Sequence, residues 1–297
     1  MNKNNKLKNI AYLSTLGFGA YKLFKVATRK AKRENLKNQV IVITGASSGI
    51  GKSYAYAFAE LGANIVLAAR SKDKIEQLAK EIEEKYQVKT LAIQTDVSVE
   101  EQAKNLIDIT LEHFDNIDIL INNAGVAGYN YIHESKVQDM KKIMDINYWG
   151  MVYCTYSVLP SMIRRRKGRI VNISSVVGKR AMPIMGAYSA SKFAMEGFSE
   201  SLRVEVKKFG IGVTVICPTT TKTDIVNNAF EGDNLKIGSI GMSSDRVAKE
   251  TINAILDNKR EHILGFAENI GLKINNTFPS LVDNVLTIAP KFMLGEK

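Results

Sequence analysis

The chain has 297 residues, of which 45% are hydrophobic and 24% are charged. It is long enough for one large folded domain, and its composition excludes a disordered or fibrous protein. The two cysteines, Cys154 and Cys217, show no CxxC or Cys/His spacing, and the three histidines are scattered. We therefore expect neither a disulfide framework nor a metal site. This cysteine usage fits a reducing, cytoplasmic compartment.

The net charge of +11 is concentrated at the N-terminus. Residues 1–38 contain ten Lys or Arg against one acid, Glu34, which gives +9 for this segment. The rest of the chain shows no basic stripe interleaved with aromatic residues, which is what nucleic-acid binding would require. A nucleic acid is therefore not expected as a partner.

The same basic segment is mostly apolar between residues 10 and 27. Its uninterrupted apolar part is shorter than the ~20 residues of a spanning helix, and no cleavage site typical of an export signal follows. Three interpretations remain open: an interfacial helix that attaches the protein to a membrane surface, a helix packed on the protein or a partner, or a disordered tail. We treat residues 1–36 as a segment separate from a folded domain over residues 37–297.

A strand, a glycine loop and a helix follow one another from residue 40. The β-branched run VIVIT at residues 40–44 is typical of a strand buried in a parallel sheet, and residues 50–61 have a helical pattern. In the intervening loop, Gly45 permits a tight turn, Gly49 lets backbone amides approach a pyrophosphate, and Gly51 lets the helix lie close to the sheet. The context predicts a dinucleotide at the helix N-terminus, with a turn that binds no ligand as the structural alternative.

The next strand, at residues 64–69, ends in Arg70 and Ser71. NAD-binding folds commonly carry an acidic residue there for the adenosine ribose. Because an arginine can instead pair with a 2′-phosphate, the sequence predicts NADP(H) in preference to NAD(H). The alternative is that Arg70 is a solvated charge at a strand end.

Strand and helix patterns continue to alternate along the chain. We expect helices at 73–85 and 99–113, strands at 89–95 and 117–121, a long helix at 137–166, and a strand at 169–174. Such alternation predicts an α/β fold with a three-layer, doubly wound parallel sheet of the Rossmann type in a single domain.

A further helix, which begins near residue 187, carries Tyr188 and Lys192 four positions apart and thus on one face. A nearby ammonium favours the phenolate and would lower the pKa of Tyr188 toward neutrality, as a general acid/base requires. Ser175, at the end of the preceding strand, can hydrogen-bond a substrate oxygen beside Tyr188. Hydride transfer from a nicotinamide would complete the reaction.

In order and spacing, these motifs resemble the short-chain dehydrogenase/reductase family over about residues 37–265. They are TGASSGIG (44–51), Asp96-Val97, NNAG (122–125), NxxG from Asn147, ISS ending at Ser175, and YSASK (188–192). The resemblance implies that Tyr188 is the acid/base and that Ser175 positions the substrate. It also implies that Lys192 lowers the tyrosine pKa and binds the nicotinamide ribose, while Asn147 supports a water-linked proton relay.

The resemblance further implies a set of cofactor-binding residues. Asp96 would lie near the adenine and Thr223 near the carboxamide. The full set is Gly45, Ser47, Ser48, Gly49, Ile50, Gly51, Arg70, Ser71, Asp96, Val97, Asn123, Ala124, Gly125, Tyr188, Lys192, Pro218 and Thr223. One departure is Thr219, which follows Pro218 where the family usually has glycine, and which is expected to affect the nicotinamide approach or the substrate loop.

The C-terminal third bears on the substrate. Residues 219–244 fall where such enzymes carry a substrate lid, and residues 262–297 form an extension with apolar residues at helical spacing. This extension is either a lid or dimer-packing helix pair, or an apolar surface that serves a lipophilic substrate of steroid, retinoid, fatty aldehyde or 3-oxoacyl type. The resemblance also implies a homodimer or homotetramer.

The expected function is therefore an oxidoreductase that interconverts a carbonyl and an alcohol. The competing hypothesis is a catalytically silent NADP-binding sensor or scaffold protein, against which the complete set of motif residues argues. A nucleotide-sugar dehydratase or epimerase would need a larger C-terminal substrate domain than this chain has.

Overall fold

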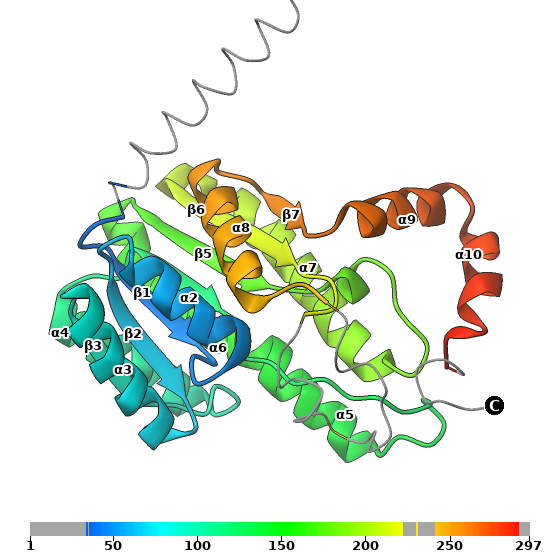
Figure 1. Ribbon diagram of the computed structural model, residues 1–297, viewed down its shortest axis with the longest axis horizontal. Coiled ribbons are helices and arrows are strands. Elements are labelled where there is room, and N and C mark those ends of the chain that lie inside the picture. The colour runs from blue at the N-terminus through cyan, green and yellow to red at the C-terminus, as the bar shows by residue number, and fades with distance from the viewer. Residues whose placement is uncertain (1–33, 35, 222–229, 231–240, 291–297) are drawn as a thin grey trace, which may run out of the picture.

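The computed structural model describes residues 34, 36–221, 230 and 241–290, which form a seven-stranded parallel sheet in a single domain (Figure 1). The predicted doubly wound α/β fold is confirmed. The strand order is β3-β2-β1-β4-β5-β6-β7. The strands are β1 (Val40–Thr44), β2 (Asn64–Ala69), β3 (Thr90–Gln94), β4 (Ile119–Asn122), β5 (Gly168–Ile173), β6 (Ile211–Cys217) and β7 (Glu261–Ile263).

The strand order reverses next to β1, which pairs with β2 on one side and with β4 on the other. In an open parallel sheet, a crevice forms outside the carboxyl ends of the strands at such a switch point. The first, fourth and fifth strands all end there. Loops that follow these strands are thus brought together although they lie far apart in the sequence.

Helices cover both faces of the sheet (Figure 1). On one face, α2 (Gly49–Ala59), α3 (Lys72–Tyr86) and α8 (Ser244–Leu256) share an apolar core with the sheet. On the other face, α4 (Glu100–Phe114), α6 (Gly150–Arg165) and α7 (Gly186–Val206) build a second core. Most strand residues are buried on both faces, which explains the continuous apolar runs in the sequence. The part of the chain that the structure describes also contains short 3₁₀ helices, η2 (Val176–Gly178) and η3 (Lys207–Phe209).

The long helix expected at 137–166 is interrupted. It consists of α5 (Val137–Met144), a π-helical turn η1 (Asp145–Trp149) and α6. The wider π turn rotates the side chains that follow it relative to those before it, and such turns are frequent at functional sites. Here η1 contains Asn147, whose side chain is fully buried.

The C-terminal extension forms two helices, α9 (Phe266–Thr277) and α10 (Pro279–Leu286), with Pro279 at the start of the second. Neither helix contains a buried residue. They project beyond the sheet in Figure 1. Among the described residues, polar contacts connect them to the body between Thr219 and Glu268, between Asn269 and the Ile263 carbonyl, and between Arg180 and Asp283.

Two expectations fall largely outside the described residues. Nearly all of the basic segment 1–36 lies outside them, as does most of the lid expected at 219–244, including Thr223. Within the described part of the chain, no helix combines the length and apolar character needed to cross a bilayer.

Candidate functional site

A cleft of about 950 Å³ opens at the carboxyl ends of β1, β4 and β5. It is lined by most of the residues that the sequence singled out. These are Gly45, Ser47, Ser48, Gly49, Ile50, Arg70, Ser71, Asp96, Val97, Asn123, Ala124, Gly125, Ser175, Tyr188, Lys192 and Pro218. Gly51 and Asn147 lie behind the wall, and Thr223 is outside the described residues.

The glycine loop between β1 and α2 has the conformation that its sequence predicts. Gly45 and Gly49 have positive φ values of 65° and 54°. A Cβ at Gly51 would lie 2.1 Å from the carbonyl oxygen of Gly45, so the helix can approach the turn only because residue 51 has no side chain. Ser48 precedes α2 but makes no side-chain capping hydrogen bond.

This loop fits a dinucleotide phosphate group. The first amides of α2 have no side-chain cap, and the helix dipole favours an anion at that end. The glycines keep the approach to these amides free of side chains. The fit therefore rests on backbone geometry.

Thr44 and Asn123 hold the loop against the end of β4. The hydroxyl oxygen of Thr44 accepts hydrogen bonds from the backbone N–H groups of Asn123 and Ala124, each at 3.0 Å. The side-chain amide of Asn123 donates to the carbonyl oxygens of Thr44 at 2.9 Å and Gly45 at 3.2 Å. Asn123 was predicted to lie along the cofactor. Its contacts in the structure show that it fixes the glycine loop.

At the far end of the cleft, Arg70 and Ser71 follow β2, and Asp96 follows β3. Lys74, on the first turn of α3, adds a second exposed cation that sequence reasoning missed. One carboxylate oxygen of Asp96 accepts hydrogen bonds from the backbone and hydroxyl of Ser98, at 3.0 and 2.7 Å. This end thus combines two cations with a carboxylate held in a turn.

The Tyr188 hydroxyl is buried and hydrogen-bonded to the side chain of Ser175. Burial raises the pKa of Tyr188 above its ordinary value, the neighbouring Tyr129 raises it further, and the hydrogen bond with Ser175 opposes both. This direction differs from the lowered value expected from the sequence. The reason is desolvation, which the spacing of Tyr188 and Lys192 does not reveal.

Lys192 lies one helical turn after Tyr188 on α7. Its ammonium donates a hydrogen bond of 2.8 Å to the carbonyl oxygen of Ile173 and lies 5.6 Å from the centre of the Tyr188 ring. Burial lowers the pKa of Lys192 to about 8, while the negative charge of Glu196 acts in the opposite direction. The lysine and the tyrosine therefore meet as the sequence predicted.

Asn147 joins two walls of the site from behind. Its side-chain oxygen accepts from the backbone N–H of Val126 at 2.8 Å. Its amide donates to the Val126 carbonyl and to the Ser191 hydroxyl, each at 2.9 Å. These contacts connect the loop after β4 to the helix that carries Tyr188.

The remaining wall of the cleft is mainly apolar. It contains Val126, Ala127, Tyr129, Val176, Val177, Met182 and Met185. Near them, the Thr219 hydroxyl donates a hydrogen bond of 2.6 Å to Glu268 of α9, which also lines the cleft. Sequence reasoning missed Glu268, and the unusual Thr219 was the only signal that could have pointed to it.

Comparison with known proteins decides the family. A family model described as short chain dehydrogenase matches residues 39–234, which is most of the folded domain. The chain belongs to the short-chain dehydrogenase/reductase family. As such it is an oxidoreductase, and its proposed cofactor is a nicotinamide dinucleotide. Within its described residues, no group of three or more His, Cys, Asp or Glu could hold a metal ion.

Among curated relatives of this short-chain dehydrogenase/reductase, "Dehydrogenase/reductase SDR family member 7B" of Danio rerio is 32% identical. That alignment covers 93% of this chain and 93% of the relative. The Mus musculus protein of the same name is 34% identical over 90% of this chain and 86% of its own length. The similarity therefore extends beyond the part of the chain that the family model matches.

Solved structures of the family superimpose on most of the chain. A Burkholderia phymatum enzyme in complex with NAD has a TM-score of 0.77 and 26% identity, covering 83% of this chain and 95% of that one. A Sphingobium yanoikuyae enzyme in complex with NADPH has a TM-score of 0.71 and 28% identity, covering 82% and 95%. Both forms of the cofactor therefore occur in proteins with this fold.

The glycine loop between β1 and α2 provides the first test. In the variant Gly51→Ala the new Cβ would meet the Gly45 carbonyl. We expect it to lose about 1–3 kcal/mol of stability through overpacking and to bind NADPH more weakly.

Gly197→Ala is the matched control, because a Cβ there meets no atom within 4 Å. It should gain about 0.5–1 kcal/mol of stability. Fluorescence titration and urea unfolding measure both effects. Equal NADPH affinity in the two variants would contradict the assignment of this loop.

Proposed function

We propose that this oxidoreductase prefers NADP(H) and reduces the carbonyl group of a lipophilic substrate, with Tyr188 as general acid. The proposal is carried by one observation: Tyr188 is buried in a cleft with an apolar wall, its hydroxyl is hydrogen-bonded to Ser175, and the ammonium of Lys192 lies 5.6 Å from the centre of its ring. A group so placed can donate a proton to an oxygen that Ser175 holds.

In this proposal each side chain has a separate task. Ser175 donates a hydrogen bond to the carbonyl oxygen of the substrate and aligns it with Tyr188. Tyr188 then transfers its proton to that oxygen, and the Lys192 ammonium stabilises the phenolate that remains. When bound, a reduced nicotinamide supplies the hydride to the carbonyl carbon. In the reverse direction, the Tyr188 phenolate accepts the proton of an alcohol.

The proposed cofactor site uses residues from every loop at this edge of the sheet. Backbone amides at Ser47, Ser48 and Ile50 would hold the phosphates, and Arg70 the adenosine 2′-phosphate. Lys192 would hold the nicotinamide ribose, and Asn147 would support a proton relay to solvent. The remaining predicted contacts are Ser71, Asp96, Val97, Asn123, Ala124, Gly125, Pro218 and Thr223.

Tyr188→Phe tests the reaction class. It removes only the hydroxyl, so we expect the rate of NADPH oxidation to fall by about 10²-fold or more, while NADPH binding is retained. The carbonyl substrates should range from small polar compounds to long-chain aldehydes and steroid ketones. Tyr156→Phe is the matched control, because that ring is 75% exposed on α6, and it should keep the wild-type rate.

Each outcome of the substrate panel bears on a different part of the proposal. Turnover of long-chain or steroid carbonyls would support the lipophilic substrate, and turnover of small polar ones alone would refute it. Cofactor binding without turnover of any carbonyl would favour the alternative, a catalytically silent NADP-binding sensor or scaffold.

Arg70→Ala tests the cofactor preference. A charge-assisted hydrogen bond to the 2′-phosphate contributes about 1.5–3 kcal/mol, so the KM for NADPH should rise about 10- to 100-fold while that for NADH stays the same. Lys72→Ala is the control, because Lys72 pairs with Glu76 on the surface of α3. Equal use of NADH and NADPH by the wild type would show that the proposed preference is wrong.

A lipophilic substrate would agree with attachment to a membrane surface, which we propose for the basic, apolar segment 1–36. This proposal is supported by a row of exposed apolar residues at helical spacing along α9, the helix whose Glu268 lines the cleft. These are Phe266, Ile270, Ile274 and Phe278, with exposed fractions between 42% and 83%. Assembly into a homodimer or homotetramer stays a prediction.

Vesicle binding tests the attachment. We expect the full-length protein to sediment with vesicles that contain phosphatidylserine at low salt, and to be released as salt screens the lysines. Vesicles of phosphatidylcholine alone are the control and should bind less protein. Full recovery in the supernatant at low salt would refute attachment through this segment.

A further inference from the structure

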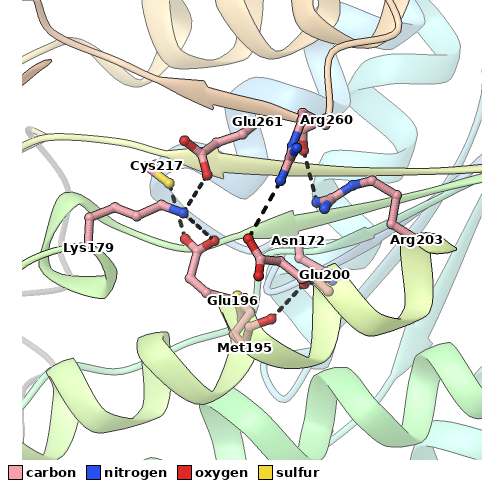
Figure 2. A network of polar contacts seen from close by, with 10 residues as sticks. Asn172, Lys179, Met195, Glu196, Glu200, Arg203, Cys217, Arg260 and Glu261 are labelled. Atoms are coloured by element: carbon pink, nitrogen blue, oxygen red, sulfur yellow. Dashed lines mark hydrogen bonds and ion pairs between the residues drawn. The ribbon is translucent and has the colours of Figure 1, made fainter.

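Figure 2 shows a partly buried cluster of charges around Lys179, Glu196 and Glu261. The ammonium of Lys179, at the end of η2, lies between the carboxylates of Glu196 on α7 and Glu261 on β7. The bond to Glu196 measures 2.8 Å. The thiol of Cys217, the last residue of β6, donates to the other oxygen of Glu196 at 3.2 Å. Three elements thus meet at the Glu196 carboxylate, and β7 joins them through Lys179.

Glu196 lies one helical turn after Lys192, on the same face of α7. Both side chains are buried, with exposed fractions of 8% and 3%. A buried ammonium without a counter-charge tends to lose its proton. The carbonyl oxygen of Ile173 accepts a hydrogen bond from Lys192 but carries no net charge. A negative charge that balances the ammonium must therefore come from another residue.

We propose that Glu196 is a positioning residue for the reaction, whose carboxylate, held by Lys179 and Cys217, keeps the Lys192 ammonium charged below Tyr188. The role rests on the proposed function of Tyr188 and Lys192. Lys179, Glu196 and Glu261 together carry one positive and two negative charges, so the cluster is negative overall. Glu196 is the residue of this cluster that lies on α7 with Lys192, and its carboxylate is also the one to which the Cys217 thiol donates.

The cluster also connects the segment that begins at Ser175 to helix α7. Lys179 follows the η2 segment that begins at Ser175, and a Cβ at Gly178 would lie 3.1 Å from Cβ of Lys192. The bonds from Lys179 therefore connect the Ser175 segment to the helix of Tyr188 and Lys192. Within the described residues, titratable or charged groups close to this region are Tyr129, Lys179, Tyr188, Glu196, Glu200, Arg203, Cys217, Arg260, Glu261 and Glu268.

Glu196→Gln tests the proposal through the pH profile of kcat/KM for NADPH-dependent reduction of the carbonyl that the wild type reduces fastest. Activity requires the Lys192 ammonium and the protonated Tyr188, so it is lost as the pH rises through their pKa values. Removing the negative charge lowers both values. We expect the alkaline limb of Glu196→Gln to move to lower pH by about one unit.

Lys179→Met provides a test of opposite sign. It removes a positive charge beside the same carboxylate, so the alkaline limb should move to higher pH. A merely structural role would not move the two variants in opposite directions. Urea unfolding measures the stability of each variant, and Lys179→Met remains informative if Glu196→Gln does not fold.

Glu200→Gln is the matched control. Glu200 lies one turn farther along α7, is exposed, and pairs with Arg260 at 3.6 Å (Figure 2). Its profile should coincide with that of the wild type. An unchanged profile for Glu196→Gln, or shifts of Glu196→Gln and Lys179→Met in the same direction, would overturn the role of Glu196. Absence of Tyr188-dependent turnover in the wild type would instead refute the proposed function, and this role with it.

Discussion

The burial of the Lys192 ammonium is the constraint on which the site depends. An ammonium taken out of water loses several kcal/mol of solvation, which the protein must offset with hydrogen bonds and opposite charge. Here a carbonyl at the end of β5 and a carboxylate on α7 do so, and Tyr188 lies within reach of the same charge. The ends of β5 and β6 and the first turns of α7 must therefore meet closely, and the cleft lies where they do.

In the other half of the cleft, backbone N–H groups need hydrogen-bond acceptors. The loop that follows β4 leaves two N–H groups unpaired at a crowded edge, and the single hydroxyl of Thr44 accepts both. Asn123 returns hydrogen bonds to the carbonyls at the end of β1. The amides at the start of α2 have no side-chain cap, so they are available to an anion. Parallel pairing of β1 with β4 thus holds the glycine loop in the conformation that the proposed phosphate site needs.

Local patterns were sufficient to predict the parallel sheet, the glycine loop and the approach of Tyr188 to Lys192, because each depends on residues close in sequence. Contacts between distant residues were not predictable. Lys179 and Glu261 are 82 positions apart. The π turn that buries Asn147 has no signature in residues 137–166, which have a continuous helical pattern. The raised pKa of Tyr188 was missed because burial depends on the whole fold and not on the spacing of two side chains.

The substitution of Thr219 for the usual glycine connects substrate choice to the C-terminal extension. Helices α9 and α10 bury no residue, so a core does not fix their place. They are held by polar contacts instead, among them those from Thr219 to Glu268, from Asn269 to Ile263 and from Arg180 to Asp283. Arg180 follows the segment that begins at Ser175, so the extension is attached to the loop that would position the substrate. Changes in α9 and α10 can therefore reshape the apolar wall while Ser175, Tyr188 and Lys192 keep their geometry.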